Sequence, residues 1–593
     1  MGADLARTLQ PLAQDLFDAL WLEDVYGFRS HCRPAPAHGA MDIALGQPGE
    51  YLRWFGQPAD GLRPLRIDTR AAEHIHNDRP VAEAGASSVP VARLASVLEQ
   101  AQWWQAAAGQ LSTPFALACE QAGYAATQAP SIIARLHAQP SALAHWEALS
   151  SLRDRPFHPL ARAKPWSLTT QTRERFSPEA GHPIALQWVA VAAGRWLASP
   201  LAAATAPAAH LLNAAQRSRL QRRARARGLH TRAYRWLPVH PWQRDYWEQA
   251  HGWDAAQVLD LDLQLGSGHA TASLRTLAMH EHPRAHLKLS LSAPVLGAMR
   301  YLPLRSLRNG VRAQACLECV RQRDAWLVRH LHLCDERHWW ALRQHEDVLH
   351  DRGELACLWR RYPRMGRAML VPMAALPATT ADGRLPAFDI LLGRDHGEAA
   401  IWQTFARIAE LTLELGLRCF RAGVMPELHG QNLLLAWRAG GPVAVVLRDH
   451  DSLRICAPLL REHGLAAPEY LIADDGRNTL LLETPAQLLA YLQTLLIEVN
   501  LHAVLAAIAT QRGGSEARGW RLLKEALSRV LARVPLPVAY AAQTRELLLD
   551  AATWPFKQVL QPLLAQLQPA DGMPSAMDAL ANPLRMTPRQ ETG

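Results

Sequence analysis

The feature that most constrains the fold of this chain is a β-hairpin with polar residues at both of its outer ends. Two apolar stretches, Leu433–Trp437 and Val443–Leu447, flank the turn sequence Arg-Ala-Gly-Gly-Pro. Apolar runs on either side of a Gly-rich turn predict two antiparallel strands. Because antiparallel strands lie about 4.8 Å apart, the residues just before and just after the hairpin must be close neighbours.

Five polar side chains should therefore meet at the mouth of this hairpin. Glu427, His429, Gln431 and Asn432 precede the first strand in the segment Glu-Leu-His-Gly-Gln-Asn, and Asp449 follows the second strand. Carboxylate and amide oxygens suit Mg²⁺, which usually bridges to phosphate groups. These residues predict a metal–nucleotide site. The alternative is a polar cap that hydrogen-bonds only to its own turn.

A second cluster predicts a phosphate-binding surface. It comprises Ser273, Arg275 and Thr276 in the sequence Ser-Leu-Arg-Thr, followed by Lys288 and Arg300. The segment 286–295 alternates apolar and polar residues, which predicts a strand with Lys288 on its polar face. Hydroxyl, guanidinium and ammonium groups on neighbouring strands bind polyphosphate without a Walker loop, and the sequence contains no Walker motif. Only four of the 63 Lys and Arg residues are Lys, so each Lys is a candidate for a site that needs a compact ammonium.

A third cluster is Phe157-His158-Pro159 with Arg162 and Lys164 beyond it. These cations could hold substrate carboxylates, and the alternative is an ordinary solvated loop. The segment His240-Pro-Trp-Gln243 is by itself no more than a helix start.

The 593 residues are too many for one core, so we expect two or three subdomains. Residues 1–130 are predicted to be helical, with helical spacing of apolar residues at 5–23 and 92–107 and a Pro- and Gly-rich stretch at 34–64 between them. Residues 131–376 are predicted to mix helices and strands, and residues 377–593 to be mostly helical around the hairpin. The polar tail beyond Gln568 is expected to fray. The helices expected in the last part are 401–417, 485–508, 520–534 and 543–566.

Several broad classes are not expected. The N-terminus lacks a secretory pattern, and we identify no long uncharged apolar run, so a cytosolic protein without a membrane span is predicted. The net charge is +9, but the basic residues are spread along the chain, which does not favour nucleic-acid binding. A basic surface also suits acidic small substrates.

Six motifs taken together resemble the NRPS-independent siderophore synthetases, the IucA/IucC family. They occur in the family's order, over residues 145–455. They are Phe-His-Pro-x-x-Arg-x-Lys at 157–164, His-Pro-Trp-Gln at 240–243, Ser-Leu-Arg-Thr at 273–276, His-Leu-Lys-Leu-Ser-Leu at 286–291 followed by Arg300, Glu-Leu-His-Gly-Gln-Asn at 427–432, and Arg-Asp at 448–449.

The resemblance implies an α+β fold shaped like a cupped hand. It has an N-terminal thumb (1–130), fingers with a mixed sheet (131–376) and a mostly helical palm (377–593). It also implies that ATP and Mg²⁺ are used to adenylate a small polycarboxylic acid, with release of pyrophosphate, before an amine or alcohol attacks. A homodimer is a further expectation from the family.

Residue roles follow from the resemblance by matching position. The implied ATP contacts are Ser273, Arg275, Thr276, Lys288, His429 and Gln431. The implied metal ligands are Glu427, Gln431, Asn432 and Asp449. The implied contacts to the acid are His158, Arg162, Lys164, Arg300 and His429, and the residues expected to act in catalysis are Lys288, Arg300 and His429.

Two departures from the family pattern concern the acid. The order Arg162 then Lys164 reverses the usual Lys then Arg. In addition, Leu296-Gly297-Ala298 stands where a Ser or Thr often helps to hold citrate. Citrate is the first choice and 2-oxoglutarate is the rival.

Two other classes of function compete with a ligase. A small-molecule phosphotransferase has a similar His-Gly-Asp segment before a hairpin and a later Asp, but Gln431 stands where its catalytic Asp would be. A ferric-siderophore reductase would need a terminal cysteine cluster, and no cysteine follows Cys456.

Overall fold

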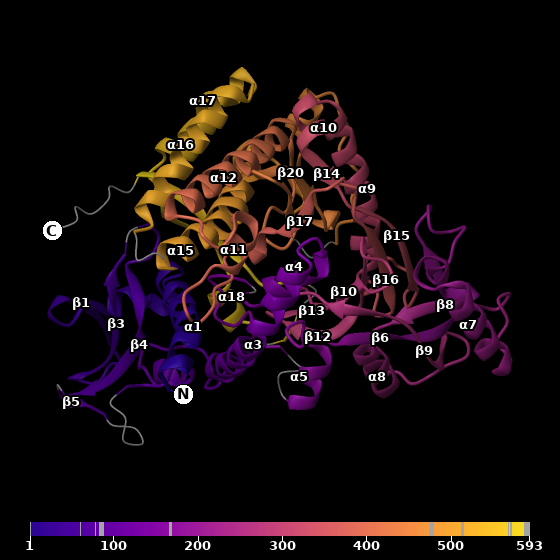
Figure 1. Ribbon diagram of the computed structural model, residues 1–593, viewed down its shortest axis with the longest axis horizontal. Helices are drawn as coiled ribbons and strands as arrows, with labels where there is room; N and C mark the ends of the chain where they lie inside the picture. Colours follow the sequence, from indigo (N-terminus) through magenta and orange to yellow (C-terminus); the bar gives the residue numbers. More distant parts are fainter. Residues whose placement is uncertain are drawn as a thin grey trace.

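A computed structural model of the chain describes residues 2–59, 61–77, 79–81, 88–153, 155–164, 169–473, 479–511, 515–566, 568–569 and 572–585. The fold is α+β, as predicted, and contains several separate sheets. Figure 1 shows a small sheet near the N-terminus, a large sheet at the opposite side of the molecule, and a group of long helices above them.

The N-terminal part contains more strand than its sequence predicts. After helix α1 (Gly2–Leu22), an antiparallel sheet forms in the order β1-β2-β3-β4-β5. The expectation of a wholly helical segment was wrong, because buried Leu52 and Trp54 alternate with half-buried Arg53, which is the pattern of a strand. Only Leu94–Leu98 of the helix expected at 92–107 forms, as α2. The bounds of the strands are Cys32–Ala35, Ala40–Ala44, Glu50–Pro58, Leu65–His76 and Arg79–Pro80.

An eight-stranded sheet occupies the middle of the chain, in the order β7-β15-β16-β11-β10-β9-β6-β8. Each of its strand pairs is antiparallel, so the mixed sheet expected for the fingers is not this one. In chain order its strands are Pro183–Ala192 (β6), Trp196–Ala198 (β7), Tyr234–Val239 (β8), Val258–Ala270 (β9), Thr276–Met279 (β10), Ala285–Leu289 (β11), Asp335–Leu342 (β15) and Ala356–Arg361 (β16).

The strand expected at 286–295 is divided in two. Strand β11 belongs to the large sheet, whereas β12 (Leu291–Val295) pairs with β13 (Ala298–Arg300). Between them, the Ser290 hydroxyl donates a hydrogen bond to the Gly353 carbonyl, 2.5 Å away. The chain therefore leaves the large sheet soon after Lys288, and Arg300 is placed on a separate two-stranded ribbon.

The predicted hairpin forms as β19 (Leu433–Arg438) and β20 (Gly441–Leu447). Strand β19 also pairs with β17 (Met369–Pro372), and β20 pairs in parallel with β14 (Leu331–Leu333). This four-stranded sheet is the mixed one. Because β17 and β14 come from residues before 377, the sheet joins both sides of the expected fingers–palm boundary.

The helices around the hairpin agree with the sequence except near the end. Helix α12 is Glu398–Arg421, α14 is Pro485–Tyr491, a π-helical segment is Leu492–Leu501, α15 is His502–Gln511 and α16 is Ala517–Arg533. The helix expected at 543–566 was wrong, because α17 (Val538–Arg545) and a π-helical turn (Glu546–Asp550) lead into strand β23 (Thr553–Gln558). Pro555 lies inside that strand and is incompatible with a helix interior.

The C-terminal tail is partly ordered, contrary to expectation. Strand β24 (Ala576–Ala581) pairs with β23, and residues 586–593 lie outside the described part of the chain. The continuous helical stretch Pro485–Gln511 is long and apolar enough to cross a membrane by composition, but 89% of its most apolar window is buried within the protein.

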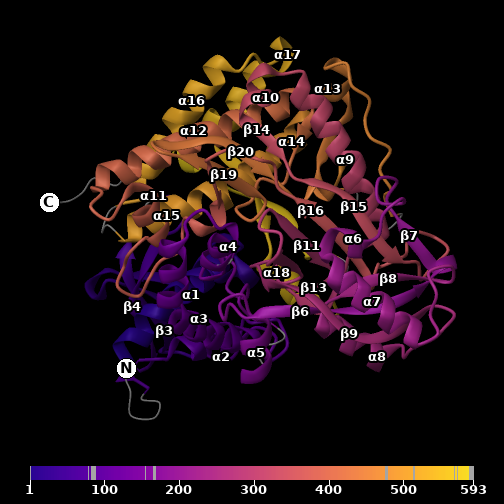
Figure 2. The same ribbon diagram turned by 45° about the vertical axis from the view of Figure 1, so that its right-hand side comes forward.

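Among the described residues, two large hydrophobic cores each contain side chains from more than one of the expected subdomains, and the division at 130 and 376 stays a prediction. The first core joins α1, the N-terminal sheet, the large sheet and helix α18 (Leu560–Leu564). The second joins the C-terminal helices to α3 (Ser112–Ala138) and α4 (Leu143–Ser151). Figure 2 shows α18 among elements from the first half of the chain. The C-terminal segment thus returns to the middle of the molecule, where the candidate site lies.

Candidate active site

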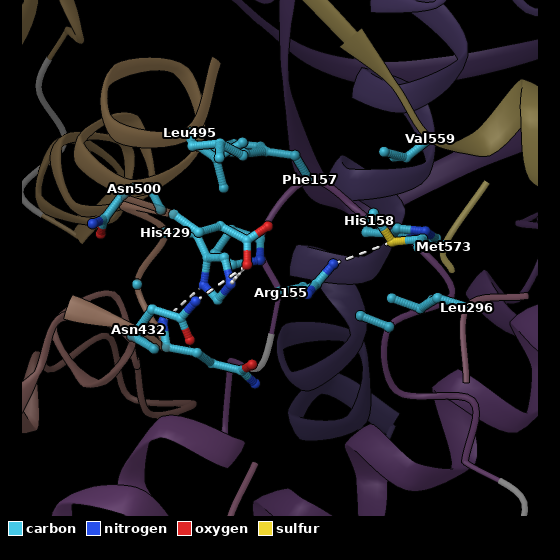
Figure 3. A pocket seen from close by; sticks show the side chains of 18 of the residues that line it. Arg155, Phe157, His158, Leu296, His429, Asn432, Leu495, Asn500, Val559 and Met573 are labelled. Atoms are coloured by element: carbon cyan, nitrogen blue, oxygen red, sulfur yellow. Dashed lines mark hydrogen bonds and ion pairs between the residues drawn. The ribbon is translucent and has the colours of Figure 1, made fainter. Parts of the chain in front are cut away.

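A cavity of about 410 Å³ lies where these parts meet, and Figure 3 shows part of its lining. Its walls come from the end of α1, the loop 155–164, strands β11 to β13, the hairpin mouth, the π-helical segment 492–501 and strand β23. Eleven of the thirteen residues predicted for the site line it: His158, Lys164, Ser273, Arg275, Lys288, Arg300, Glu427, His429, Gln431, Asn432 and Asp449.

The basic strand and the hairpin mouth face each other directly. The Lys288 ammonium forms an ion pair with the Asp449 carboxylate, 161 positions along the chain. Asp449 also contacts the Arg360 guanidinium at 2.7 Å, and Arg360 in turn pairs with Glu336. These cations hold the pKa of Asp449 well below its usual range against the effect of burial. The Asp449 carboxyl is therefore ionised at neutral pH.

The hairpin mouth is a second polar group. The Asn432 amide donates to Glu427 Oε2 at 3.2 Å, and His429 Nε2 lies 3.6 Å from the same oxygen. Arg454 lies 3.6 Å from the other oxygen. Although burial opposes it, contact with His429 and Arg454 lowers the pKa of Glu427, so this carboxylate stays ionised.

The oxygen donors present fit a hard divalent cation in part. Glu427 and the side-chain oxygen of Asn432 could share a Mg²⁺ with phosphate oxygens, which is the usual pattern for this ion. Asp449 is already paired with two cations. The described residues include no group of three or more His, Cys, Asp or Glu that could hold a metal alone. The metal roles expected for Gln431 and Asp449 stay predictions.

The Ser-Leu-Arg-Thr segment forms a turn between β9 and β10. Leu274 adopts a left-handed conformation with φ of 66°, and the Arg275 guanidinium donates to the carbonyl of Tyr301. Thr276 is buried opposite Lys288 in the β10–β11 register and does not line the cavity. Ser273 and Arg275 thus line the cavity, whereas Thr276 pairs with Lys288 on the neighbouring strand.

The loop 155–164 brings His158 to the cavity in its neutral form. Burial, with Arg155 and Lys164 nearby, lowers the pKa of His158 to about 3. Its Nδ1 accepts from the Leu160 amide at 3.3 Å, so Nε2 carries the proton, and the structure shows no partner for that buried nitrogen. A neutral N–H donor in the cavity lining suits an anionic ligand. Arg162 instead lines a separate small cavity beside α1.

The wall near Arg300 is apolar, as the sequence suggested. Arg300 donates to the Val295 carbonyl at 2.8 Å, and Leu296 lines the cavity next to Arg300. Figure 3 places Leu296 close to Met573, which accepts a hydrogen bond from Arg155 at 3.2 Å.

Sequence reasoning missed several lining residues, notably Glu23, Arg155, Asp451, Glu498 and Lys557. Burial lowers the pKa of Lys557 to about 8, although Glu427 opposes this shift. The scarcity of lysine was a usable signal for Lys557. A lone carboxyl in the apolar stretch 488–505 was a signal for Glu498. Nothing local placed either residue in the cavity, because both arrive through tertiary packing.

Comparison with known proteins agrees with the motifs. The family model described as "IucA / IucC family" matches residues 142–378, and one described as "Ferric iron reductase FhuF-like transporter" matches residues 403–575. Staphyloferrin B synthase of Staphylococcus aureus is 30% identical over 590 residues, covering 97% of both chains. A citryl-spermidine/3,4-dihydroxybenzoyl-citryl-spermidine:spermidine ligase of Bacillus anthracis is 27% identical over 40% of each chain.

Solved structures share the fold over nearly the whole chain. The petrobactin biosynthesis protein AsbB of Bacillus anthracis has a TM-score of 0.76 at 17% identity, covering 98% of this chain and 96% of that one. ATP-bound aerobactin synthetase IucA of Klebsiella pneumoniae has a TM-score of 0.70 at 18% identity, covering 98% and 99%. With a full-length relative at 30% identity and all six motifs in place, the chain belongs to the IucA/IucC family of NRPS-independent siderophore synthetases.

Proposed function

We propose that this protein is an ATP-dependent ligase that adenylates a carboxylate of citrate, or of a citrate derivative, and joins it to an amine or alcohol. The observation that supports this proposal best is that Lys288, Arg275 and Arg300 line the same cavity as the polar residues of the hairpin mouth. The full-length similarity to a siderophore synthase, and the ATP bound to a structural neighbour, support this proposal.

In this proposal the cations bind and orient both reactants. Lys288 and Arg275 hold the phosphates, while Arg300 and the Nε2–H of His158 hold the acid so that its carboxylate oxygen faces the α-phosphorus. A cation about 4 Å from a developing anionic oxygen contributes roughly 4 kcal/mol at an effective dielectric constant near 20. His429 lines the same cavity, and in this proposal it contacts both the nucleotide and the acid.

The expected Mg²⁺ would be held by Glu427 and Asn432, and when bound it supplies positive charge to the phosphate oxygens. Asp449 has a different role in our proposal. By pairing with Lys288 and Arg360, it holds the ammonium in place for the incoming phosphate.

The cupped-hand arrangement is part of the proposal. The thumb supplies Ala19, Glu23 and Leu62 to the cavity, and the fingers and palm supply the remaining walls. A cytosolic location and a homodimer remain expectations from the sequence pattern and the family resemblance.

The acid is proposed to be citrate or a citrate derivative, with 2-oxoglutarate as the competing acid. The citryl compounds in the name of the Bacillus anthracis relative favour the first. The absence of a hydroxyl at Leu296, Gly297 and Ala298 favours an acid that needs fewer hydrogen bonds on that side.

Product analysis tests the proposal. The protein is incubated with ATP, Mg²⁺ and either citrate or 2-oxoglutarate, with hydroxylamine as a general nucleophile. We expect an acid-dependent hydroxamate together with AMP and pyrophosphate. Formation of ADP and a phosphorylated acid would instead identify a phosphotransferase and refute the ligase.

A further inference from the structure

One carboxyl group in the cavity wall differs from the other acidic residues there. Five acidic residues line the cavity in the described part of the chain: Glu23, Glu427, Asp449, Asp451 and Glu498. Glu23 accepts hydrogen bonds from the backbone N–H groups of Val559, Leu560 and Gln561. Glu427 and Asp449 have the partners described above, and Asp451 lies in the field of Lys288 and Arg275.

Glu498 has no such compensation. It is 3% exposed, and Oε1 is buried without a hydrogen-bond partner. Burial alone raises the pKa of Glu498 well above its usual range, with no contribution from a neighbouring charge. A buried carboxyl that is left unpaired destabilises the folded protein, so its retention at a cavity wall points to a ligand.

The backbone at this position also favours a ligand site. Glu498 belongs to the π-helical segment Leu492–Leu501, and such widened turns occur frequently at functional sites. The wide turn lets Leu495, Glu498 and Asn500 all line the cavity, although a regular helix would place residues 498 and 500 on opposite faces. Figure 3 shows Leu495 and Asn500 across the cavity from Leu296.

The charges in the cavity indicate what the ligand is. Among the described residues, six cationic side chains line the cavity and can bind its anionic reactants: Arg155, Lys164, Arg275, Lys288, Arg300 and Lys557. Glu498 instead lies among aliphatic lining residues, with Leu495, Val499 and Ala503 on the same helical stretch. An aliphatic wall with one carboxyl complements an alkyl chain that ends in an ammonium group.

Building on the proposed function, we propose that Glu498 is the residue that selects the nucleophile, by binding an ammonium group at the far end of its alkyl chain. The amine that attacks must be neutral, because an ammonium nitrogen has no lone pair. Glu498 therefore holds the second, non-reacting nitrogen. When this ammonium group binds, Glu498 releases its proton to solvent and the two opposite charges compensate each other in the buried site.

A matched set of nucleophiles tests this assignment. 1,2-Diaminoethane, ethylamine and 2-aminoethanol have the same carbon chain and differ in the terminal group. Each is assayed with the wild-type enzyme, ATP, Mg²⁺ and the acid that gives hydroxamate. We expect the lowest KM for 1,2-diaminoethane. Glu498→Gln keeps the shape of the side chain without the charge and should raise that KM at least about 30-fold, which is the usual effect of removing one partner of a buried charge pair.

Three controls make the outcomes distinct. Hydroxamate formation by Glu498→Gln should stay within about threefold of wild type, because hydroxylamine carries no ammonium group for Glu498 to bind. Glu498→Asp retains the charge and should retain the preference for the diamine. Gln493→Met removes a buried polar group of the same helix that bonds the Leu547 carbonyl and does not line the cavity, so amine use should not change.

Each negative result has its own meaning. A wild-type enzyme that forms no hydroxamate with either acid refutes the proposed function. If hydroxamate forms but Glu498→Gln uses 1,2-diaminoethane normally, only the Glu498 assignment is overturned. An equal loss of hydroxamate and diamine product in a folded Glu498→Gln would place Glu498 in the acid or ATP half-reaction and would also overturn it. Thermal melting confirms folding, and the Tm should not fall because an unpaired carboxyl is removed.

Discussion

The ion pair between Lys288 and Asp449 allows the chemical role of Lys288 to be separated from its structural role. Lys288→Met removes the charge and keeps an unbranched side chain of similar length. If Lys288 holds a phosphate, the loss is bounded by the roughly 4 kcal/mol that a cation about 4 Å away contributes at an effective dielectric constant near 20. We therefore expect kcat/KM for ATP to fall about 100- to 1,000-fold, the range found for preorganised electrostatic donors.

The expected effect on stability is much smaller. Without Lys288, the Asp449 carboxylate still forms an ion pair with Arg360 at 2.7 Å, so its charge keeps a partner. Lys288→Met should therefore lower the free energy of unfolding by only about 1–2 kcal/mol, because the Asp449 carboxylate keeps its second cationic partner. Arg360→Met is the matched control. Arg360 is 1% exposed and pairs with both Glu336 and Asp449, so its loss leaves buried carboxylates short of a partner and should cost about 3–5 kcal/mol.

The assay combines hydroxamate formation over a range of ATP concentrations with thermal melting of both variants. The expected pattern is an inactive Lys288→Met protein that melts close to wild type and an Arg360→Met protein that melts clearly lower. Activity of Lys288→Met within tenfold of wild type would show that this ammonium does not serve the nucleotide. A Tm as low as that of Arg360→Met would show that its main role is structural.

Three further predictions concern other parts of the molecule. Glu427→Gln should raise the Mg²⁺ concentration needed for half-maximal pyrophosphate release at least about tenfold, because one anionic donor is lost; an unchanged Mg²⁺ requirement would place the metal elsewhere. Lys164→Ala should raise KM for the acid about tenfold or more whereas Arg162→Ala, outside the cavity, should change it less than threefold, and equal effects would contradict this placement. Burial raises the pKa of Asp18 from 3.8 to about 7, so its protonated form favours folding and this contribution declines as pH rises from about 4 and is lost above 7. Asp18→Asn mimics the protonated form at every pH, so the Tm of this variant relative to that of wild type should rise between pH 5 and pH 8. Tm curves that stay parallel over this range would refute the prediction.

Local sequence predicted the helices at 401–417, 485–508 and 520–534 and the hairpin, because these elements depend on interactions between residues that are close in the sequence. The hairpin at 433–447 needs only alternating apolar residues and a Gly-rich turn, so its mouth brings Glu427, Asn432 and Asp449 near one another without help from the rest of the chain. The helix predicted at 543–566 was wrong because strand β23 pairs with β24, about twenty residues later, and the local sequence does not reveal that pairing.

The sequence by itself determined the residue types of the site, the hairpin that gathers its acidic and amide groups, and the family to which the chain belongs. Only the tertiary structure decided that Lys288 pairs with Asp449, that Arg162 lies outside the cavity, and that Glu498 and Lys557 lie within it. These placements depend on how α1, the large sheet and the C-terminal segment pack around two shared cores. Burial and charge pairing are properties of that packing, and no local pattern of residues specifies them.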